Sequence, residues 1–400
     1  MAMAAAVYLN TTAKNWQYED TSADQADATP SDGSSRALAF HKCQPLYSAT
    51  PLYSLSSLAK DLGVGYVLLK DESSRFGLPS FKILGASWGV YRAVEEHLKQ
   101  VGALEATDAL RSLSGLGAQA KKWGLKLSTA TAGNWGRAVA SMAKNLGIPA
   151  LVYVPSHMPE TTRNLIRGEE AEVMPVNGSY DDAVEVAKHA AGTEGHLLVM
   201  DISWEGYTQV PEWVVEGYQT MLDESDAQAL AVTGGKRVTH AVIPVGCGLI
   251  AQAVTQHYKS SVRQRHGSPA ATVIAVEPTT AACLRRSLEE GKMTSVATGS
   301  SIMSGMNCGT LSTISWPVLK SGVNVSVVVS EAESHAAVQE LDGLGVQAGP
   351  CGAATLASLK RVCALERGAI GIDETSVIIL YCTEGARDYQ IQPGPGPMGI

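Results

Sequence analysis

The sequence alternates short, strongly apolar runs with segments of helical periodicity. The apolar runs are rich in β-branched residues and lack polar alternation, which is typical of parallel strands buried on both faces. Strands that alternate with helices predict an α/β fold with a parallel sheet, and in such sheets ligands bind beyond the carboxyl ends of the strands. The predicted strands are YVLLK (66–70), ALVYVP (150–155), HLLVMD (196–201), HAVIPVG (240–246), TVIAVEP (272–278), VSVVVS (325–330) and SVIILYC (376–382).

Size and charge narrow the class of protein. A chain of 400 residues exceeds one hydrophobic core, which predicts two domains. The net charge of -8, without a basic run, argues against a nucleic-acid partner. No apolar run reaches the length of about eighteen residues that a membrane helix needs, so we expect no membrane partner.

The N-terminus and the cysteines indicate a cytoplasmic location. The first apolar run is short and lacks the basic segment of a secretory signal. The seven cysteines are odd in number and scattered, with no C-x-x-C pair. This pattern favours reduced thiols over disulfides, and it predicts no metal site.

Lys82 lies in the largely apolar stretch PSFKILGASWGV (79–90), directly after Phe81. One interpretation is structural: a lysine at the start of an amphipathic helix buries its stem and leaves its amine in water. The other is chemical: a partly desolvated lysine can attack an aldehyde, as the lysine that binds pyridoxal phosphate (PLP) does. The second interpretation requires a phosphate site, a partner for the pyridine nitrogen and a loop for the substrate carboxylate.

Four other segments supply candidates for these parts, and each also has a structural explanation. The glycine turn 246–249 between a strand and a helix suits a phosphate, or only a tight turn. The loop STATAGNWG (128–136) suits a carboxylate, or only caps a helix. Cys382, at the end of a strand, suits a ring nitrogen or fills space. Asp201, after an apolar strand, suits a role in catalysis, or only caps the next segment.

The order of these parts along the chain resembles that of the fold type II PLP enzymes, the tryptophan synthase β-like family. Within it, five segments look like those of the diaminopropionate ammonia-lyases: FHKCQPLYSATPLYSLSSLAKDLGVGYVLLKDESSRFGLPSFKILGAS (40–87), DISWEGYTQVPEWVVEGY (201–218), VEPTTAACLRRSL (276–288), SIMSGMNCGT (301–310) and YCTEGARD (381–388). The resemblance covers roughly residues 36–390. It implies the tryptophan synthase β-like α/β fold, with two domains that each contain a mainly parallel sheet flanked by helices.

The resemblance also implies a cofactor, PLP, and roles for individual residues. Lys82 and Asp201 are the expected catalytic residues. The expected cofactor contacts are Phe81, Lys82, Asn134, Gly246, Cys247, Gly248, Leu249 and Cys382. The expected substrate contacts are Thr131, Ala132, Gly133 and Trp135. Members of the family are usually homodimers, so a homodimer is expected.

We expect four segments in the domain organisation. They are a flexible N-terminal extension (1–35), a large PLP-binding domain (36–85 and 205–390), a small domain with the carboxylate loop (86–204) and a C-terminal tail (391–400).

The implied reaction is elimination of ammonia from 2,3-diaminopropionate, which gives pyruvate and ammonia. The chain departs from the family at Ala132 and Trp135, where the family has aspartate and histidine. That aspartate is associated with deprotonation of the D-isomer, so we expect the L-form to be preferred. Serine/threonine dehydratase-type elimination, β-replacement on another amino acid, and a catalytically idle homologue with a binding role remain as alternatives.

Overall fold

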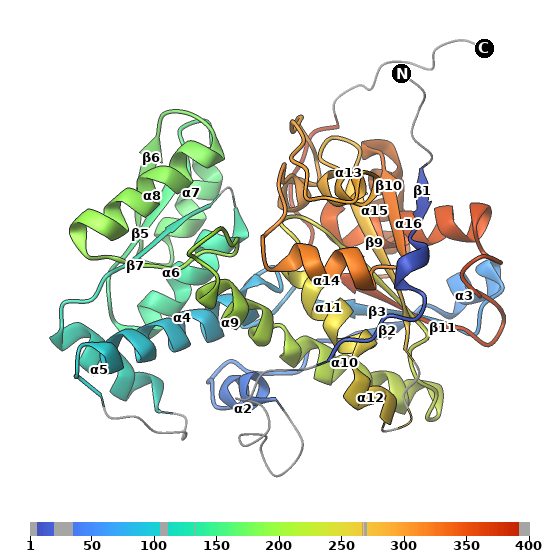
Figure 1. The fold of residues 1–400 in the computed structure, drawn as a ribbon, viewed down its shortest axis with the longest axis horizontal. Helices are drawn as coiled ribbons and strands as arrows, with labels where there is room; N and C mark the ends of the chain where they lie inside the picture. Colours follow the sequence, from blue (N-terminus) through green and yellow to red (C-terminus); the bar gives the residue numbers. More distant parts are fainter. Residues whose placement is uncertain are drawn as a thin grey trace.

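The computed structural model describes residues 6–19, 35–104, 111–131, 133–265, 267 and 270–391, which form two sheets connected by helices (Figure 1). The larger sheet has seven strands in the order β1–β10–β9–β8–β11–β3–β2. Its five inner strands are parallel, and each edge strand runs antiparallel to its neighbour. The strands are β1 (Val7–Leu9), β10 (Val325–Val329), β9 (Thr272–Pro278), β8 (His240–Pro244), β11 (Val377–Cys382), β3 (Tyr66–Asp71) and β2 (Leu52–Ser54).

Helices cover both faces of the larger sheet, so its central strands β8 and β11 are buried at every residue. One face packs against α10 (Gln219–Thr233) and α11 (Leu249–Lys259), and the other packs against α16 (Pro350–Leu365). This double burial explains why the strand sequences lack polar alternation. The other elements around this sheet are α2 (Arg36–Lys42), α3 (Ser56–Leu62), α12 (Ser261–Arg265), α13 (Cys283–Glu290), α14 (Ser315–Gly322), α15 (Glu331–Gly343) and the 3-10 turns η1 (Thr11–Ala13) and η2 (Ser304–Met306).

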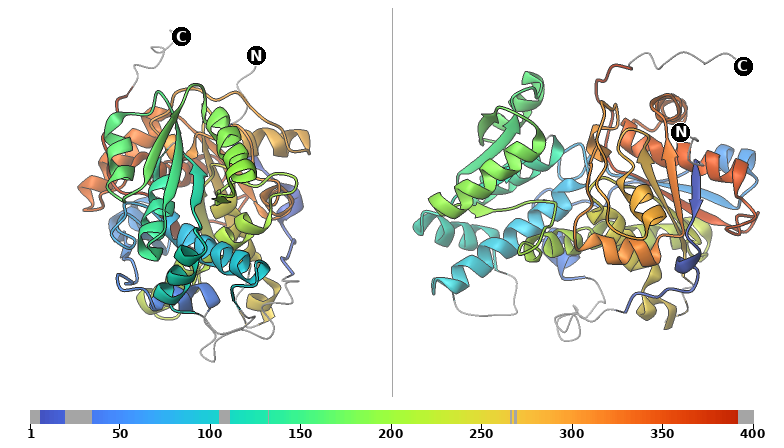
Figure 2. Two further views of the ribbon diagram at one scale, coloured as in Figure 1. Left: turned by 90° about the vertical axis from the view of Figure 1, so that its left-hand side faces the viewer. Right: turned by 45° about the horizontal axis from the view of Figure 1, so that its top comes forward.

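The smaller sheet has four parallel strands in the order β6–β5–β4–β7 (Figure 2). They are β6 (Glu172–Val176), β5 (Ala150–Pro155), β4 (Leu127–Ala130) and β7 (Leu197–Leu198). The helices of this part are α5 (Leu113–Lys122), α6 (Asn134–Leu146), α7 (Glu160–Arg167) and α8 (Tyr180–Glu194). The core beside α6 continues into the larger sheet, whereas α8 covers a separate small cluster on the opposite face.

Two crossing helices, α4 (Lys82–Gln100) and α9 (Gln209–Gly217), connect the sheets. Glycines allow their close approach: a Cβ at Gly217 would lie 2.5 Å from the carbonyl oxygen of Leu84. A Cβ at Gly85 would similarly lie 2.7 Å from Val214. Because α4 begins with Lys82, this contact helps to fix the position of that lysine.

The structure differs from the expected flexible extension over residues 6–19. β1 pairs with β10 as an edge strand, and the Asn10 amide donates to the carbonyl oxygens of Lys320 (2.8 Å) and Val323 (2.9 Å). The rest of the predicted extension, 20–34, and most of the predicted tail lie outside the described residues.

The α/β fold is confirmed, and each of the seven predicted strands is present. The predicted domain limits stay a prediction: the boundary at 85/86 falls in the first turn of α4, and the boundary at 204/205 falls in the turn before α9.

Candidate active site

Lys82 lies at the first position of α4, where the chain enters the helix from the loop after β3. The loop is tied to the end of β11, because the Phe81 N–H donates to the Thr383 carbonyl oxygen at 3.1 Å. Phe81 itself packs against Tyr218, with ring centroids 5.0 Å apart. The lysine side chain is 20% exposed, so it lies at the edge of the core.

Asp201 forms an ion pair with Lys82. Asp201 follows β7, and its side chain is 10% exposed. Burial alone would lower the pKa of the Lys82 amine, but the charge of Asp201 and the hydrogen bond to it raise that pKa above its ordinary value. The amine is therefore protonated in this state. It must lose a proton before it can act as a nucleophile or a base, and the Asp201 carboxylate is in contact with it.

Trp135 contacts the same lysine. The Lys82 amine lies 5.9 Å from the centroid of the indole ring. The indole N–H points away from the lysine, into the core, where it donates to Thr129 Oγ1 (2.9 Å) and the Val199 carbonyl oxygen (3.3 Å). The Trp135 ring therefore faces the Lys82 amine, whereas its N–H is bonded to residues of the core.

The predicted carboxylate loop precedes α6. Thr131 Oγ1 accepts a hydrogen bond from the Gly133 N–H at 2.9 Å, and this local turn leads into the helix at Asn134. The Asn134 side chain is half-buried and forms no hydrogen bond with another described residue, so its amide is available to a ligand. Ala132 lies outside the described residues.

The turn Gly246–Leu249 joins β8 to the N-terminus of α11. A Cβ at Gly246 would lie 2.9 Å from the Gly305 carbonyl oxygen, and Gly248 has a φ of +101°. Both positions therefore require glycine. The first N–H groups of a helix have no partner within it and carry partial positive charge, so they bind anions. The residues of this turn fit a phosphate group.

Cys247, within this turn, contacts the backbone of Asp201. Its thiol donates to the Asp201 carbonyl oxygen at 2.8 Å. Burial and the Asp201 charge raise the pKa of the thiol to about 11, so it remains protonated at neutral pH. This contact brings the predicted phosphate turn, Asp201 and Lys82 into one site.

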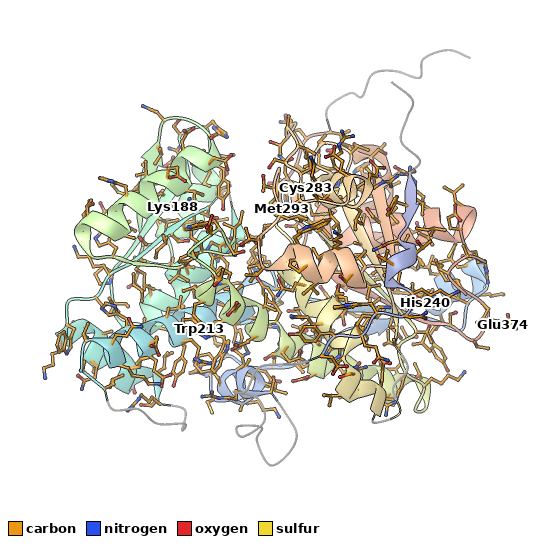
Figure 3. All side chains as sticks on the ribbon, viewed as in Figure 1. Lys188, Trp213, His240, Cys283, Met293 and Glu374 are labelled. Carbon is orange, nitrogen blue, oxygen red and sulfur yellow. The ribbon has the colours of Figure 1, made fainter. Side chains whose placement is uncertain are left out.

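Further thiols surround the same turn. Figure 3 labels Cys283 in the part of the molecule that holds the larger sheet, and its thiol lies 3.9 Å from the Gly246 carbonyl oxygen. The Cys308 sulfur would lie 3.3 Å from a Cβ at Gly246. Burial raises the pKa of both thiols. They line the turn as neutral groups.

Cys382 is placed differently from the other predicted residues. It is fully buried, and its sulfur would lie 2.6 Å from a Cβ at Gly352 in α16. The thiol lies 3.5 Å from the carbonyl oxygen of Glu384, to which it donates. The structure therefore gives Cys382 a packing contact with α16, and its contact with the pyridine nitrogen stays a prediction.

The sequence did not reveal three polar residues near the site. Ser203 and Ser312 are buried and bond to each other, at 3.2 Å from the Ser203 N–H to Ser312 Oγ. The pKa of Tyr180 is raised by burial and by the charge of Asp201, which places its hydroxyl in the field of that carboxylate. Only Tyr180 carried a signal, as a bulky phenol in the acidic first turn of α8.

Comparisons with known proteins identify the family of the chain. The family model described as "Pyridoxal-phosphate dependent enzyme" matches residues 44–381. The chain is 36% identical over 321 residues to the diaminopropionate ammonia-lyase of Salmonella typhimurium, a match that covers 78% of this chain and 75% of that protein. It is 29% identical over 366 residues to the Escherichia coli diaminopropionate ammonia-lyase, with 87% of each chain covered.

Solved structures show the same architecture. The Escherichia coli diaminopropionate ammonia lyase in complex with an aminoacrylate-PLP azomethine reaction intermediate has a TM-score of 0.80 and 27% identity, and the match covers 95% of this chain and 93% of that one. A threonine deaminase from Solanum lycopersicum shares the fold, with a TM-score of 0.67 at 20% identity over 88% and 84% of the two chains. The predicted fold type II architecture and the predicted cofactor are thus confirmed, and the chain belongs to the pyridoxal-phosphate dependent enzyme family.

Proposed function

We propose that this enzyme eliminates ammonia from 2,3-diaminopropionate, with a preference for the L-isomer, to give pyruvate and ammonia. The observation that carries the proposal is the ion pair of Lys82 and Asp201 beside the Gly246–Leu249 turn. It supplies two groups that exchange protons next to a phosphate-binding turn, as an elimination requires. The similarity to two diaminopropionate ammonia-lyases supports the choice of substrate.

Several residues would hold the cofactor. The Lys82 amine would bind its aldehyde, the Gly246–Leu249 turn its phosphate, and the Asn134 amide its ring oxygen. When bound, PLP withdraws electrons from the substrate α-carbon and so makes the Cα proton acidic. Thr131 and Gly133 would face the substrate carboxylate, since they lie in the loop before α6.

Two residues would move the protons. Lys82, once its amine is neutral, would remove the Cα proton of the L-isomer. Asp201 would hold the β-amino group in its protonated form, so that the electron pair of the breaking C–N bond leaves with ammonia. Hydrolysis of the remaining enamine consumes one water, so that one diaminopropionate gives pyruvate and two molecules of ammonia.

Serine/threonine dehydratase-type elimination is the second candidate. It is favoured by Trp135, whose indole N–H bonds within the core and cannot donate to a substrate as a histidine would. The human L-serine dehydratase/L-threonine deaminase is 26% identical to this chain over 330 residues. β-Replacement and an idle binding role are the remaining alternatives.

The test is to incubate purified enzyme separately with L- and D-diaminopropionate, serine and threonine, and to assay 2-oxo acid and ammonia. We expect product from L-diaminopropionate at the highest kcat/KM, and none from Lys82→Ala. Product only from serine or threonine would favour the dehydratase. No product from any substrate would contradict the lyase assignment, and absorbance of bound PLP would then distinguish an inactive preparation from an idle homologue.

Location and assembly are further proposals. Among the described residues, no helix is long and apolar enough to cross a bilayer, and all seven cysteines are free thiols. Reduced thiols suit the cytoplasm, which we propose as the location. We also propose a homodimer, which size-exclusion chromatography with light scattering would test.

A further inference from the structure

A buried set of hydrogen bonds connects the segment after Asp201 to the loop before α14. The Ser203 N–H donates to Ser312 Oγ at 3.2 Å, and Ser203 Oγ lies 2.9 Å from Thr313 Oγ1. Ser203 Oγ also accepts from the Ile314 N–H at 3.1 Å, and the Ser203 carbonyl oxygen accepts from the Thr313 N–H at 3.4 Å. One serine therefore forms four contacts with three consecutive residues that lie more than a hundred positions later in the sequence.

The same loop contacts the phosphate turn. The Ser312 N–H donates to the Cys247 carbonyl oxygen at 2.7 Å. The Cys247 thiol donates in turn to the Asp201 carbonyl oxygen at 2.8 Å. These contacts close a ring of four residues, Asp201, Ser203, Ser312 and Cys247, which we call the serine bridge. Ser312 is fully buried, and Ser203 is 4% exposed.

The segment before Asp201 is held to the smaller sheet: the Val199 N–H donates to the Ser128 carbonyl oxygen (2.9 Å), and the Met200 N–H donates to the Tyr207 hydroxyl (3.1 Å). β7 is only two residues long and forms the edge of the smaller sheet, and Asp201 lies three residues beyond its end. The carboxylate has Lys82 as its side-chain partner. The serine bridge connects this segment to the side of the larger sheet, to which Lys82 and the phosphate turn belong.

We propose that Ser203 and Ser312 are positioning residues, whose hydrogen bonds hold the Asp201 carboxylate against the Lys82 nitrogen. The proposal deepens the proposed function and rests on the role assigned there to Asp201. A carboxylate that moves away stabilises the protonated Lys82 nitrogen less, because the attraction falls with distance. Loss of either serine hydroxyl should therefore make this nitrogen lose its proton at lower pH.

The experiment compares Ser203→Ala, Ser312→Ala and the double variant with Ser334→Ala. Ser334 is a matched control because it is fully buried and donates to the Pro350 carbonyl oxygen (2.8 Å), outside the serine bridge. The first measurement is a pH titration of PLP-loaded enzyme without substrate, followed by its visible absorbance. Its midpoint is the pH at which half of the absorbance change has occurred. We expect each single variant to lower the midpoint by about 0.5–1 pH unit, and Ser334→Ala to leave it unchanged.

The second measurement is kcat/KM on L-diaminopropionate. We expect about a tenfold fall in each single variant, mainly in kcat, and a larger fall in the double variant, because the Ser203 and Ser312 hydroxyls form separate hydrogen bonds. Equal midpoints in the wild type and both single variants, with PLP bound, would overturn the proposal. The absorbance titration needs no substrate, so a wild type that is inactive on diaminopropionate would contradict the proposed function and still leave the serine bridge tested.

Should one single variant fail to bind PLP, the other still tests the proposal, because the two hydroxyls form separate hydrogen bonds. Ser312→Thr is the conservative variant, since it keeps the hydroxyl. We expect its midpoint to match the wild type. A midpoint lowered as far as in Ser312→Ala would show that the hydroxyl is not what matters.

Discussion

The Lys82 amine lies 5.9 Å from the centroid of the Trp135 ring, and the indole N–H points the other way, to Thr129. We expect Trp135→Phe to keep a ring beside the lysine and to lose the core hydrogen bond. The free energy of unfolding should fall by about 1–2 kcal/mol, since Thr129 and Val199 lose a buried donor. KM for the amino acid should change less than threefold. A much larger rise in KM, measured in steady-state assays, would mean that the indole N–H contacts the substrate.

Ala132 stands where the family has an aspartate that is associated with the D-isomer. We expect Ala132→Asp to supply a base on the second face of the substrate. It should raise kcat/KM for D-diaminopropionate by about tenfold or more. This is less than the roughly hundredfold that a well-placed general base contributes. Ala132→Asn is the control of equal size without the carboxylate, and it should give no such rise. Equal rates for both isomers in the wild type would show that Ala132 does not determine the preference.

The crossing of α4 and α9 gives a stability prediction. A Cβ at Gly217 would lie 2.5 Å from the Leu84 carbonyl oxygen, and backbone atoms cannot turn aside as side chains do. Gly217→Ala should therefore lower the free energy of unfolding by about 1–3 kcal/mol and weaken PLP binding, because α4 carries Lys82. Gly192→Ala, in an exposed helical position with no atom within 4 Å, should stabilise by about 0.5–1 kcal/mol. Urea unfolding monitored by circular dichroism would compare the two.

His41 predicts a pH dependence of stability. Its ring is fully buried between Thr220 Oγ1 (2.6 Å) and Ser87 Oγ (2.8 Å), and burial, with the nearby Arg75 charge, lowers its pKa to about 3. The unfolded chain, with an ordinary histidine pKa of about 6.5, binds the proton first. The contribution of the neutral His41 ring to the free energy of unfolding is thus complete above pH 6.5. It is lost as the pH falls toward 3, by up to about 1.4 kcal/mol per pH unit.

The measurement is the unfolding free energy at pH 7, 6 and 5. His41→Asn should be less stable than the wild type at pH 7 and should lose less between pH 7 and 5. Parallel curves for the two proteins would show that His41 does not cause the acid sensitivity.

Cys382 allows a direct choice between its two interpretations. Because its thiol contacts Gly352 and donates to the Glu384 carbonyl oxygen, we expect Cys382→Ala to act on packing. The variant should lose about 1–2 kcal/mol of stability and keep the absorbance maximum of bound PLP. Cys43→Ala, at an exposed position, is the control. An absorbance maximum that shifts in Cys382→Ala but not in Cys43→Ala would instead support a contact between Cys382 and the pyridine nitrogen.

The candidate site was predictable where chemistry and local sequence coincide. Lys82 in an apolar segment, and glycines between a strand and a helix, each carry a local signal, and the structure brings both to Asp201. The inner strands were predictable because burial on both faces leaves only apolar residues, as in β11. Short strands with polar residues, such as β4 with sequence LSTA, lack that signal.

Other features depend on contacts between distant segments. Ser203 and Ser312 are ordinary serines in the sequence, and they become a pair only when the loop before α14 folds against the end of β7. The direction of the Trp135 N–H follows from the position of Thr129 in β4. β1 could not be recognised because its pairing with β10 joins residues some 320 positions apart.

The place of β1 has a practical consequence. This strand covers the outer edge of β10, and its three residues precede the segment 44–381 that defines the family. A recombinant form trimmed to that segment would expose a row of unsatisfied backbone groups, and such an open edge recruits strands from other molecules. Samples intended for crystallisation should therefore retain β1 and carry any purification tag after the last strand.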